Sequence, residues 1–505
     1  MKKTNLILIL IVLVGAFLRI FQVENNPPGL YIDEVSIGYN AFSILEKGVD
    51  EHGLPFPLFF EAFGEYKMPV YIYSVTGVMM IIGKVDLAVR LPSIIAGIST
   101  IFLLYFFVKR MLVVSKTNIN KELVSQLSAF LLAITPWHIH FSRAGFEANM
   151  ALFFYLLGLY LLLIFWSKKT WRFLISSFLL FAVSIYTYNS YRVIAPLTVG
   201  ITSLIIFLRH SNLRKKITTA FILFLILIAP IIQFSLTDAG TTRYAETSTF
   251  SQYENKSPSE KRKLYPMVVV KNYISYFSFG FIFASGDGNG RHQIPGFGLF
   301  LHYLLPFVLI GVFWIISQKK SLFKNLVLYL LFIAPLPASV VAPNPHTLRS
   351  FLMVIPIVIL ASVGIAVFFK KVTKVKKFLL LFVILAAIYE TSLYLHQYYF
   401  HYYKVNSPDW GAGYKEMSMK ASGYAKEYDH IVVDKNLSNA KLYLNFYDDS
   451  IDPVFVDPDW SSPDGWGEGN VIYIRPFYGD RTRPEIIDQV YLPGREDIHA
   501  QFWKL

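Results

Sequence analysis

Two adjacent carboxylates stand in a polar loop shortly after the first apolar run of the chain. They are Asp33 and Glu34, at the end of segment 29–34, which reads GLYIDE. Neighbouring carboxylates just beyond an apolar run can supply a general base, metal ligands or both. The alternative is a solvated pair or a helix cap, because Asp33 precedes a helical pattern and aspartate is a favoured N-cap residue.

The same loop holds a lysine where a second helical pattern begins. Lys67 lies two residues before Pro69, at the start of the apolar run 68–83. Free N–H groups at a helix N-terminus and a lysine ammonium together suit the phosphate of a lipid. The alternative is a lysine that only extends to the lipid headgroups. Arg90, at the head of the next apolar run, has the same two interpretations.

A third polar group fills the segment 136–149, between two apolar runs. It includes His138, Arg143 and Glu147. Charged groups at the end of a membrane helix usually face a cavity or a partner, which makes these three residues candidates for a substrate site, a phosphate site and a second acid. The alternative is a structural pair of Arg143 and Glu147, four residues apart on one helix.

Two later segments each bring an arginine to the mouth of an apolar run. Tyr188 precedes Arg192, and His346 precedes Arg349. Arginines on the outer side of a membrane run against the usual charge bias. A shared anionic ligand would explain them, because a guanidinium matches phosphate oxygens in pairs. We therefore assign both arginines to a phosphate site and expect Tyr188 and His346 near the substrate.

The glycine-rich segment 286–298 contains Asp287, Arg291 and His292. Its spacing resembles a calcium-binding loop only superficially, because no glutamate follows at the required position. We interpret it as a flexible lid over an outer site, with these three residues as lid or substrate-site candidates. A simple glycine-rich turn is the alternative. No set of residues identifies a metal site.

The elements that position these residues are long apolar helices. The chain has 505 residues, of which 54% are hydrophobic and 16% charged, whereas a soluble domain usually has about 25% charged residues. Runs long enough to cross roughly 30 Å of hydrocarbon predict about eleven spans: 5–22, 91–108, 123–136, 149–166, 172–187, 193–208, 217–235, 297–316, 325–341, 349–369 and 378–396. The absence of cysteine excludes disulfides and thiol chemistry.

Charge sets the expected topology. The net charge of +13 comes mostly from short basic clusters between apolar runs, a pattern typical of cytoplasmic loops and not of nucleic-acid binding. All clusters face the cytoplasm only if 68–83 does not cross the bilayer, so we expect an interfacial helix there. The first run, without a cleavage site, is expected to stay as a span. The N-terminus is then inside, and the long loops 23–90 and 236–296 are outside.

The C-terminal segment differs in composition from the rest. Strand-like runs at 431–433, 453–456 and 471–474 alternate with turns, and 412–427 has a helical pattern. The predicted fold is therefore a mainly helical, polytopic membrane domain, 1–397, followed by a small α/β domain outside the membrane, 398–505.

The order of these motifs resembles one family. An outer Asp-Glu, a Lys-x-Pro at an interfacial helix, Arg-Leu-Pro-Ser opening the next span and Ser-Arg-x-x-x-acidic after the third are similar to the polytopic lipid-linked-sugar glycosyltransferases of the GT-C fold. This family includes protein O-mannosyltransferases and aminoarabinose transferases. The later Tyr-x-Ser-x-Arg, Gly-Asp…Arg-His and Pro-His-x-x-Arg segments look like its bacterial branch, and the resemblance covers roughly residues 1–400.

The resemblance implies roles for four residues. Asp33 would be the catalytic base or the carboxylate that positions the acceptor, supported by Glu34. Lys67 would contact the phosphate of the donor, and Glu147 would be the second acidic residue. Related members often have glutamate before the lysine, where this chain has Tyr66. That metal ligand is missing, so the resemblance implies no certain cofactor and leaves room for a divalent cation.

The expected activity is transfer of a hexosyl or pentosyl group from a polyprenyl-phosphate donor to a glycan, lipid or protein acceptor on the outer face of the cytoplasmic membrane. Cations would stabilise the departing phosphate, and a carboxylate would take the acceptor's proton. Three alternatives stay open: a polymerase or ligase using polyprenyl-diphosphate glycans, a transporter of lipid-linked glycans, and a structural membrane protein. A transporter would need polar groups spread through the bilayer, but here they gather at the outer ends.

Overall fold

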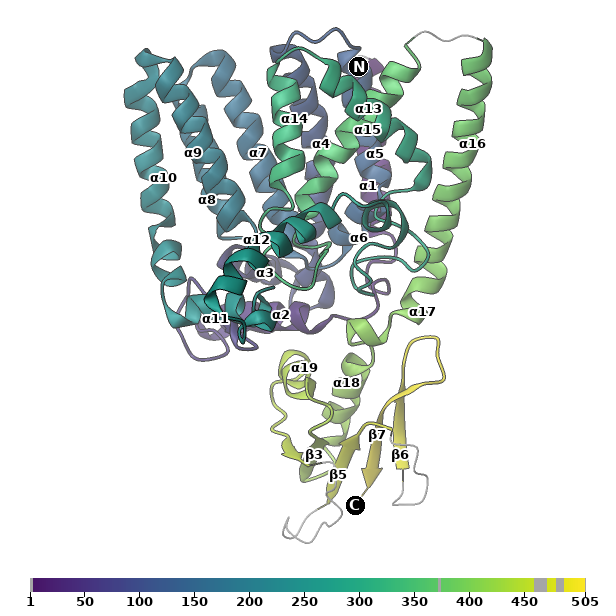
Figure 1. Cartoon of the computed structure of the whole chain (residues 1–505). Helices are drawn as coiled ribbons and strands as arrows, with labels where there is room; N and C mark the ends of the chain where they lie inside the picture. The colour runs from purple at the N-terminus through teal and green to yellow at the C-terminus, as the bar shows by residue number, and fades with distance from the viewer. Residues whose placement is uncertain (1–2, 371–373, 458–469, 478–485, 505) are drawn as a thin grey trace. The chain divides into compact units, whose positions relative to one another are not determined.

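The computed structural model describes residues 3–370, 374–457, 470–477 and 486–504. The chain divides into two compact units. Unit 1 contains Met1–Phe21, Leu58–Tyr71 and Leu91–Leu395, and unit 2 contains Gln22–Pro57, Ile72–Arg90 and His396–Leu505. Most of the long apolar helices belong to unit 1, and the main β-sheet belongs to unit 2 (Figure 1).

Each run that was expected to span the membrane forms a helix. The bounds are α1 Lys3–Ile20, α4 Asp86–Val114, α5 Lys121–Ile134, α7 Glu147–Lys168, α8 Trp171–Ile185, α9 Tyr191–Arg209, α10 Arg214–Ser235, α13 Leu305–Ser317, α14 Leu322–Ile333, α15 Val354–Phe368 and α16 Lys374–His396. By length and composition, six helical segments of the described residues can cross a membrane: Asp86–Val114, Glu147–Lys168, Tyr191–Arg209, Ser211–Ser235, Phe351–Phe368 and Lys377–Val405. The predicted fold class is confirmed.

Proline makes two of these helices shorter than expected. Helix α13 begins at Leu305, with Pro306 in its first turn, although the apolar run starts at 297. Proline is favoured there because its missing N–H would have no partner in the first turn. Helix α14 ends at Ile333, two residues before Pro335, because proline has no N–H with which to continue the helical hydrogen bonds.

The helices of unit 1 pack closely where glycine permits it. Helix α13 lies against α15, and α15 also contacts α5 and α14. A Cβ atom on Gly311 would collide with the backbone of Leu360, and one on Gly364 would collide with the backbone of Phe307. The two helices are therefore in backbone contact, as in membrane bundles that use small residues at their interfaces. A second group of adjacent helices, α7 to α10, is visible in Figure 1.

Unit 1 also contains shorter elements, which are β1 Phe60–Ala62, β2 Glu65–Lys67, α6 Pro136–Arg143, α11 Asp238–Thr247 and α12 Pro258–Ser275. Two of them, β2 and α6, carry polar residues described above. The run 68–83 forms α3, Pro69–Ile82, one of the shorter apolar helices. That α3 does not cross the membrane stays a prediction, since it depends on the distribution of charge.

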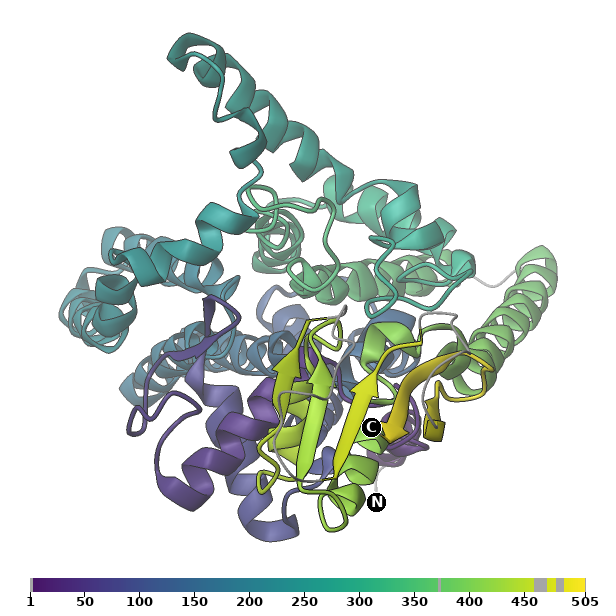
Figure 2. The ribbon, with the colours of Figure 1, turned by 90° about the horizontal axis from the view of Figure 1, so that it is seen from below.

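Unit 2 contains a five-stranded mixed sheet with the order β4-β3-β5-β7-β6, whose strands lie side by side in Figure 2. Strand β3 is parallel to β4 and β5, and β7 is antiparallel to β5 and β6. Helices α18 and α19 contribute apolar side chains to the core on one face, and the expected strands and helix are confirmed. The bounds are α2 Ile32–Lys47, α18 Tyr414–Tyr424, β3 His430–Asp434, α19 Ala440–Tyr447, β4 Val454–Val456, β5 Val471–Arg475, β6 Ile486–Tyr491 and β7 Ile498–Lys504.

Helix α2 packs on α19 within this unit. The Tyr443 hydroxyl donates to the carbonyl of Leu30 at 2.6 Å, and Gly38 leaves room for the ring of Phe446. The segment that carries the adjacent carboxylates is thus held by the C-terminal part of the chain. The boundary at 397/398 stays a prediction.

The topology can be tested with introduced cysteines, because the chain has none of its own. His52, Glu427 and Lys216 are exposed. We expect His52→Cys and Glu427→Cys to react with an impermeant maleimide on intact cells, and Lys216→Cys to react only after permeabilisation, because the basic loops face the cytoplasm. Labelling of His52→Cys only after permeabilisation would contradict the predicted orientation.

Candidate functional site

The two adjacent carboxylates have different environments. Glu34 is fully buried, and its carboxylate accepts two hydrogen bonds from Arg90, 2.9 Å from Nε to Oε1 and 3.1 Å from Nη2 to Oε2. Its Oε2 also accepts the N–H of Tyr31, the N-cap residue of α2, at 3.2 Å. Asp33 is the second residue of α2 and is partly exposed. The alternative in which Asp33 caps the helix is therefore wrong, because the capping carboxylate is Glu34.

Arg90 holds the chain that leads to these carboxylates. Besides its bonds to Glu34, its Nη1 donates to the carbonyls of Val23 and Pro27, both at 2.9 Å, and its Nη2 donates to the carbonyl of Gly29. All five N–H groups of a guanidinium are thus used within unit 2. The predicted contact of Arg90 with a donor phosphate stays a prediction, and this geometry favours a role in positioning the loop.

Lys67 and Arg192 belong to one region of unit 1. Lys67 ends β2, is 5% exposed, and its Nζ lies 5.3 Å from the centre of the Phe63 ring. The next residue, Met68, accepts a hydrogen bond at its Sδ from Arg192 Nη2, at 3.2 Å. The Arg192 guanidinium also lies 6.0 Å from the ring of Phe234. Aromatic rings therefore line both cations, which keeps them in a partly dry environment.

The segment that contains Arg192 also contacts Arg349. The Ser190 hydroxyl donates to the carbonyl of Arg349 at 3.1 Å, and the Arg349 guanidinium donates from Nη1 to the carbonyl of Ala342 at 2.6 Å. Segment 186–192 thus joins Lys67 on one side to Arg349 on the other. Three of the cations predicted to share a phosphate lie on segments in direct contact.

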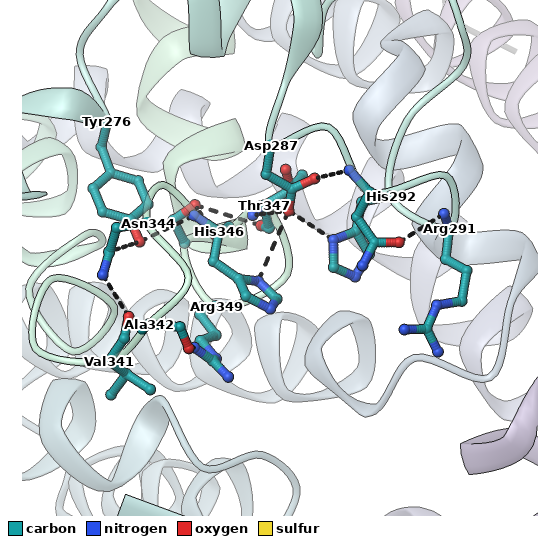
Figure 3. A network of polar contacts seen from close by, with 12 residues as sticks. Tyr276, Asp287, Arg291, His292, Val341, Ala342, Asn344, His346, Thr347 and Arg349 are labelled. Carbon is teal, nitrogen blue, oxygen red and sulfur yellow. Dashed lines mark hydrogen bonds and ion pairs between the residues drawn. The ribbon is translucent and has the colours of Figure 1, made fainter. Parts of the chain in front are cut away.

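A polar network from two distant loops surrounds Asp287 (Figure 3). Its Oδ2 lies 2.7 Å from Nδ1 of His292, accepts the N–H of Thr347 at 2.8 Å and lies 4.0 Å from Nδ1 of His346. Its Oδ1 accepts the N–H of Asn289 at 3.0 Å. Burial raises the pKa of Asp287, but the hydrogen bonds from His292, Thr347 and Asn289 outweigh it, and the pKa lies below its usual range. Asp287 is therefore an anion that joins the two loops.

Arginines flank this network. In Figure 3 the imidazoles of His292 and His346 and the guanidinium groups of Arg291 and Arg349 extend toward the same side of the loops. The phenol of Tyr276 donates to Oδ1 of Asn344 at 2.8 Å and accepts the N–H of His346 at 3.1 Å.

The network thus brings five of the predicted residues together: Asp287, Arg291, His292, His346 and Arg349. Burial raises the pKa of Tyr276 beside them, and the nearby phenol of Tyr188, which is itself buried, adds to that rise.

Helix α6 buries two of the predicted residues. Arg143 is fully buried, and its Nη1 donates to the carbonyl of Leu18 at 3.0 Å. His138 is also buried, with its Nδ1 2.6 Å from Nη2 of Arg19. Burial and the adjacent guanidinium lower the pKa of His138 well below its usual value, so a neutral imidazole accepts that hydrogen bond. His138 thus takes part in helix packing in unit 1.

Glu147 lies at the start of the following helix. Helix α6 ends at Arg143, residue Ala144 is extended, and α7 begins at Glu147. Arg143 and Glu147 therefore do not lie on one helical turn. Glu147 is partly exposed at the N-terminus of α7, where a negative charge is stabilised by the helix dipole.

Sequence analysis did not identify three residues of these networks: Arg19, His140 and Tyr276. The interruption of the first apolar run by Arg19 was the one available signal. His140 contacts the glycine-rich segment, with its Nε2 2.7 Å from the carbonyl of Arg291. Nothing in the local pattern distinguishes Tyr276 from the other tyrosines of the chain.

The fold of the chain is similar to that of solved membrane glycosyltransferases, and part of the sequence matches a family of such enzymes. Residues 66–234 match the family described as dolichyl-phosphate-mannose-protein mannosyltransferase. The structure is similar to ArnT from Cupriavidus metallidurans, solved bound to undecaprenyl phosphate, with a TM-score of 0.57, 10% identity, and coverage of 99% of this chain and 97% of that chain.

A second similar structure is the oligosaccharyltransferase AglB from Archaeoglobus fulgidus, solved with an inhibitory peptide and a dolichol-phosphate. It matches with a TM-score of 0.54 and 11% identity over 88% of this chain. The present chain spans 64% of the length of AglB. No curated protein sequence matches the chain. The resemblance noted from the motifs is confirmed at the level of the fold.

The buried pair of Arg90 and Glu34 predicts a stability effect. Arg90→Met leaves a buried carboxylate without its partner, which typically costs about 3–5 kcal/mol. We expect a clear fall in the thermal unfolding temperature of the detergent-purified protein. The double variant Arg90→Met/Glu34→Leu removes the stranded charge and is expected to recover part of the loss. If Arg90→Met unfolds at the wild-type temperature, the pair does not anchor the loop.

Proposed function

We propose that this protein is a glycosyltransferase that moves a sugar from a polyprenyl-phosphate donor to an acceptor on the outer face of the cytoplasmic membrane. The observation that carries the proposal is the association of three cation-bearing segments, those of Lys67, Arg192 and Arg349, at the polar ends of apolar helices. The shared fold with ArnT and AglB, whose structures hold a polyprenyl phosphate and a dolichol-phosphate, supports it.

The donor phosphate is the natural ligand of these cations. Lys67 supplies a point charge in an aromatic, partly dry environment, where electrostatic attraction exceeds that in water. Arg192 and Arg349 supply planar donors suited to paired phosphate oxygens. As the bond from the anomeric carbon to the phosphate oxygen breaks, negative charge grows on the departing polyprenyl phosphate. Fixed cations stabilise that charge without reorganisation.

The acceptor requires a base, for which Asp33 is the best candidate. In the proposed step an acceptor hydroxyl or amine attacks the anomeric carbon, the bond to the phosphate breaks, and the acceptor's proton passes to the carboxylate. Glu34 is unsuited to that task because both of its oxygens accept hydrogen bonds from Arg90. Asp33 is partly exposed beside it. Glu147, also partly exposed, is the proposed second acid.

The site is proposed to face the outside, because the basic clusters then lie in the cytoplasm. The bilayer and the lipid-linked sugar are the partners this implies, together with a glycan, lipid or protein acceptor. The domain 398–505 would lie on the same side. A nucleotide sugar is a poor donor there, because it is made and kept in the cytoplasm.

If Lys67 contacts the donor phosphate, Lys67→Met should lower donor binding and sugar transfer, because the substitution keeps much of the stem and removes the charge. We expect weaker binding of a polyprenyl phosphate, measured with the purified protein in nanodiscs, and about tenfold or greater loss of transfer, since a charged hydrogen bond contributes about 1.5–3 kcal/mol. Lys84→Met is the matched control, because Lys84 also lies over a phenylalanine ring, 4.0 Å from the centre of Phe42. Equal effects of both variants would contradict a phosphate site at Lys67.

Base catalysis predicts the effect of Asp33→Asn, which preserves shape but accepts a proton poorly. Loss of a general base typically lowers the rate by about 10²–10⁴-fold. We expect transfer to fall by that factor while donor binding stays near the wild-type value. Glu24→Gln, at an exposed carboxylate of the same loop, should leave both unchanged.

Transfer and binding are to be measured on one preparation, with the released lipid identified by mass spectrometry. Near-normal turnover of Asp33→Asn would remove this residue from the mechanism. Release of a polyprenyl diphosphate would favour the polymerase or ligase alternative.

A further inference from the structure

The side chains of Asp287, His292 and His346 form a compact set of metal-ligand atoms. One ligand atom from each residue lies within 4.8 Å of the other two. The side chains are 4%, 6% and 13% exposed, respectively. Two of the residues come from the glycine-rich segment and the third from the loop before α15, so the tertiary fold of unit 1 brings them together (Figure 3).

We propose that these three residues bind one divalent ion of the first transition row, with Zn²⁺ as the type ion. Bonds of about 2.0–2.2 Å hold tetrahedral ligand atoms roughly 3.3 Å apart. The carboxylate oxygen now lies 2.7 Å from one imidazole nitrogen and 4.0 Å from the other. Each side chain would therefore need to move by less than about one ångström to share an ion.

The ligand types select the class of ion. Two imidazoles and one carboxylate suit zinc and its transition-row neighbours, whereas magnesium and calcium prefer oxygen ligands. The oxygens that a calcium loop would use are directed elsewhere. Oδ1 of Asp287 accepts the N–H of Asn289, and Oδ1 of Asn289 accepts the N–H of Arg291 at 2.9 Å. Three protein ligands also leave a fourth coordination position open, as in catalytic zinc sites.

The surroundings hold the ligands in place. The N–H of Thr347 fixes the carboxylate of Asp287 at 2.8 Å. The rings of Phe141 and Phe146 lie against the imidazole of His292, with centroids 5.9 and 6.1 Å away. Supporting contacts of this kind orient metal ligands and raise affinity.

Nδ1 of His292 cannot bind a metal ion and keep its present hydrogen bond to Asp287 at the same time. Nδ1 of His292 either carries the proton that it shares with Asp287 or gives its lone pair to the ion. When the ion is bound at Nδ1, the hydrogen of the neutral imidazole must therefore lie on Nε2. This inference does not depend on the proposed transferase activity, because it concerns only three side chains of unit 1.

The test uses the full-length protein, purified without a histidine tag and stripped with a chelator. Titration with Co²⁺ should give visible d–d absorption with one ion per chain, and Zn²⁺ should displace it whereas Mg²⁺ and Ca²⁺ should not. No cysteine is present to bind cobalt elsewhere. His346→Gln is expected to weaken binding by at least about 10–100-fold, the loss seen even for residues that only support a metal ligand.

The matched control is His302→Gln. Nδ1 of His302 also lies 2.7 Å from a carboxylate, that of Glu390, but this pair has an exposed imidazole and lies outside the set of three. Binding in this variant should equal that of the wild type. Unfolding of His346→Gln in chelator should match the wild type, and Zn²⁺ should raise the unfolding temperature of the wild type more than that of the variant. No cobalt absorption in the wild type, or equal losses in both variants, would overturn the proposal.

The outcome is separable from that of the transferase proposal. Cobalt binding can fail while sugar transfer and its dependence on Asp33 and Lys67 persist, which would reject the metal site alone. Conversely, a protein without transferase activity can still bind one ion at this cluster.

Discussion

Buried arginines that bind backbone carbonyls are the interaction on which the polar end of the helical unit depends. Nη1 of Arg19 donates to the carbonyl of Ala133, and Nη1 of Arg143 donates to that of Leu18, both at 3.0 Å. These carbonyls lie in the last turns of α5 and α1, where helical carbonyls have no partner within the helix. An unsatisfied carbonyl away from water costs several kcal/mol. The arginines supply the missing donors and place a positive charge at the negative end of each helix dipole.

This requirement divides the arginines near the polar segments into two groups. Arg90 uses all five of its N–H groups within unit 2, and Arg19 and Arg143 support helix ends deep in unit 1. Arg291 and Arg349 instead border the network around Asp287, and Arg192 touches the residue after Lys67. The second group contains the cations that the proposed donor phosphate would contact. The sequence pattern alone did not separate these arginines, but their contacts in the structure differ between the two groups.

The sequence was sufficient to predict the long apolar helices and strands β3, β4 and β5, and insufficient to predict β6, β7 or the pairings of residues. The helices were recognised because long apolar runs have few other stable environments, and the three strands because they alternate with turns. The pairing of Glu34 with Arg90 joins residues 56 apart, and no local pattern encodes it. The break between α6 and α7 was not predicted. Arg143 and Glu147 are four residues apart, which suggests one helix, but this inference holds only if the backbone between them is helical. The candidate site resembles its prediction most where several loops converge, at Asp287, His292, His346 and Arg349.

Asp33 and Glu34 are adjacent on one helix, so their side chains have different environments. Successive residues of an α-helix point about 100° apart, so one carboxylate cannot enter the protein interior without directing its neighbour elsewhere. Glu34 takes the interior position, where Arg90 balances its charge. Replacing Glu34 by a neutral residue would leave that guanidinium buried without a counter-charge, which is strongly unfavourable. Asp33 stands in the first turn of the same helix and remains partly exposed, outside the buried pair. It is therefore the residue of this motif that suits the proposed role of a base, while Glu34 holds the start of the helix through its bonds with Arg90 and Tyr31.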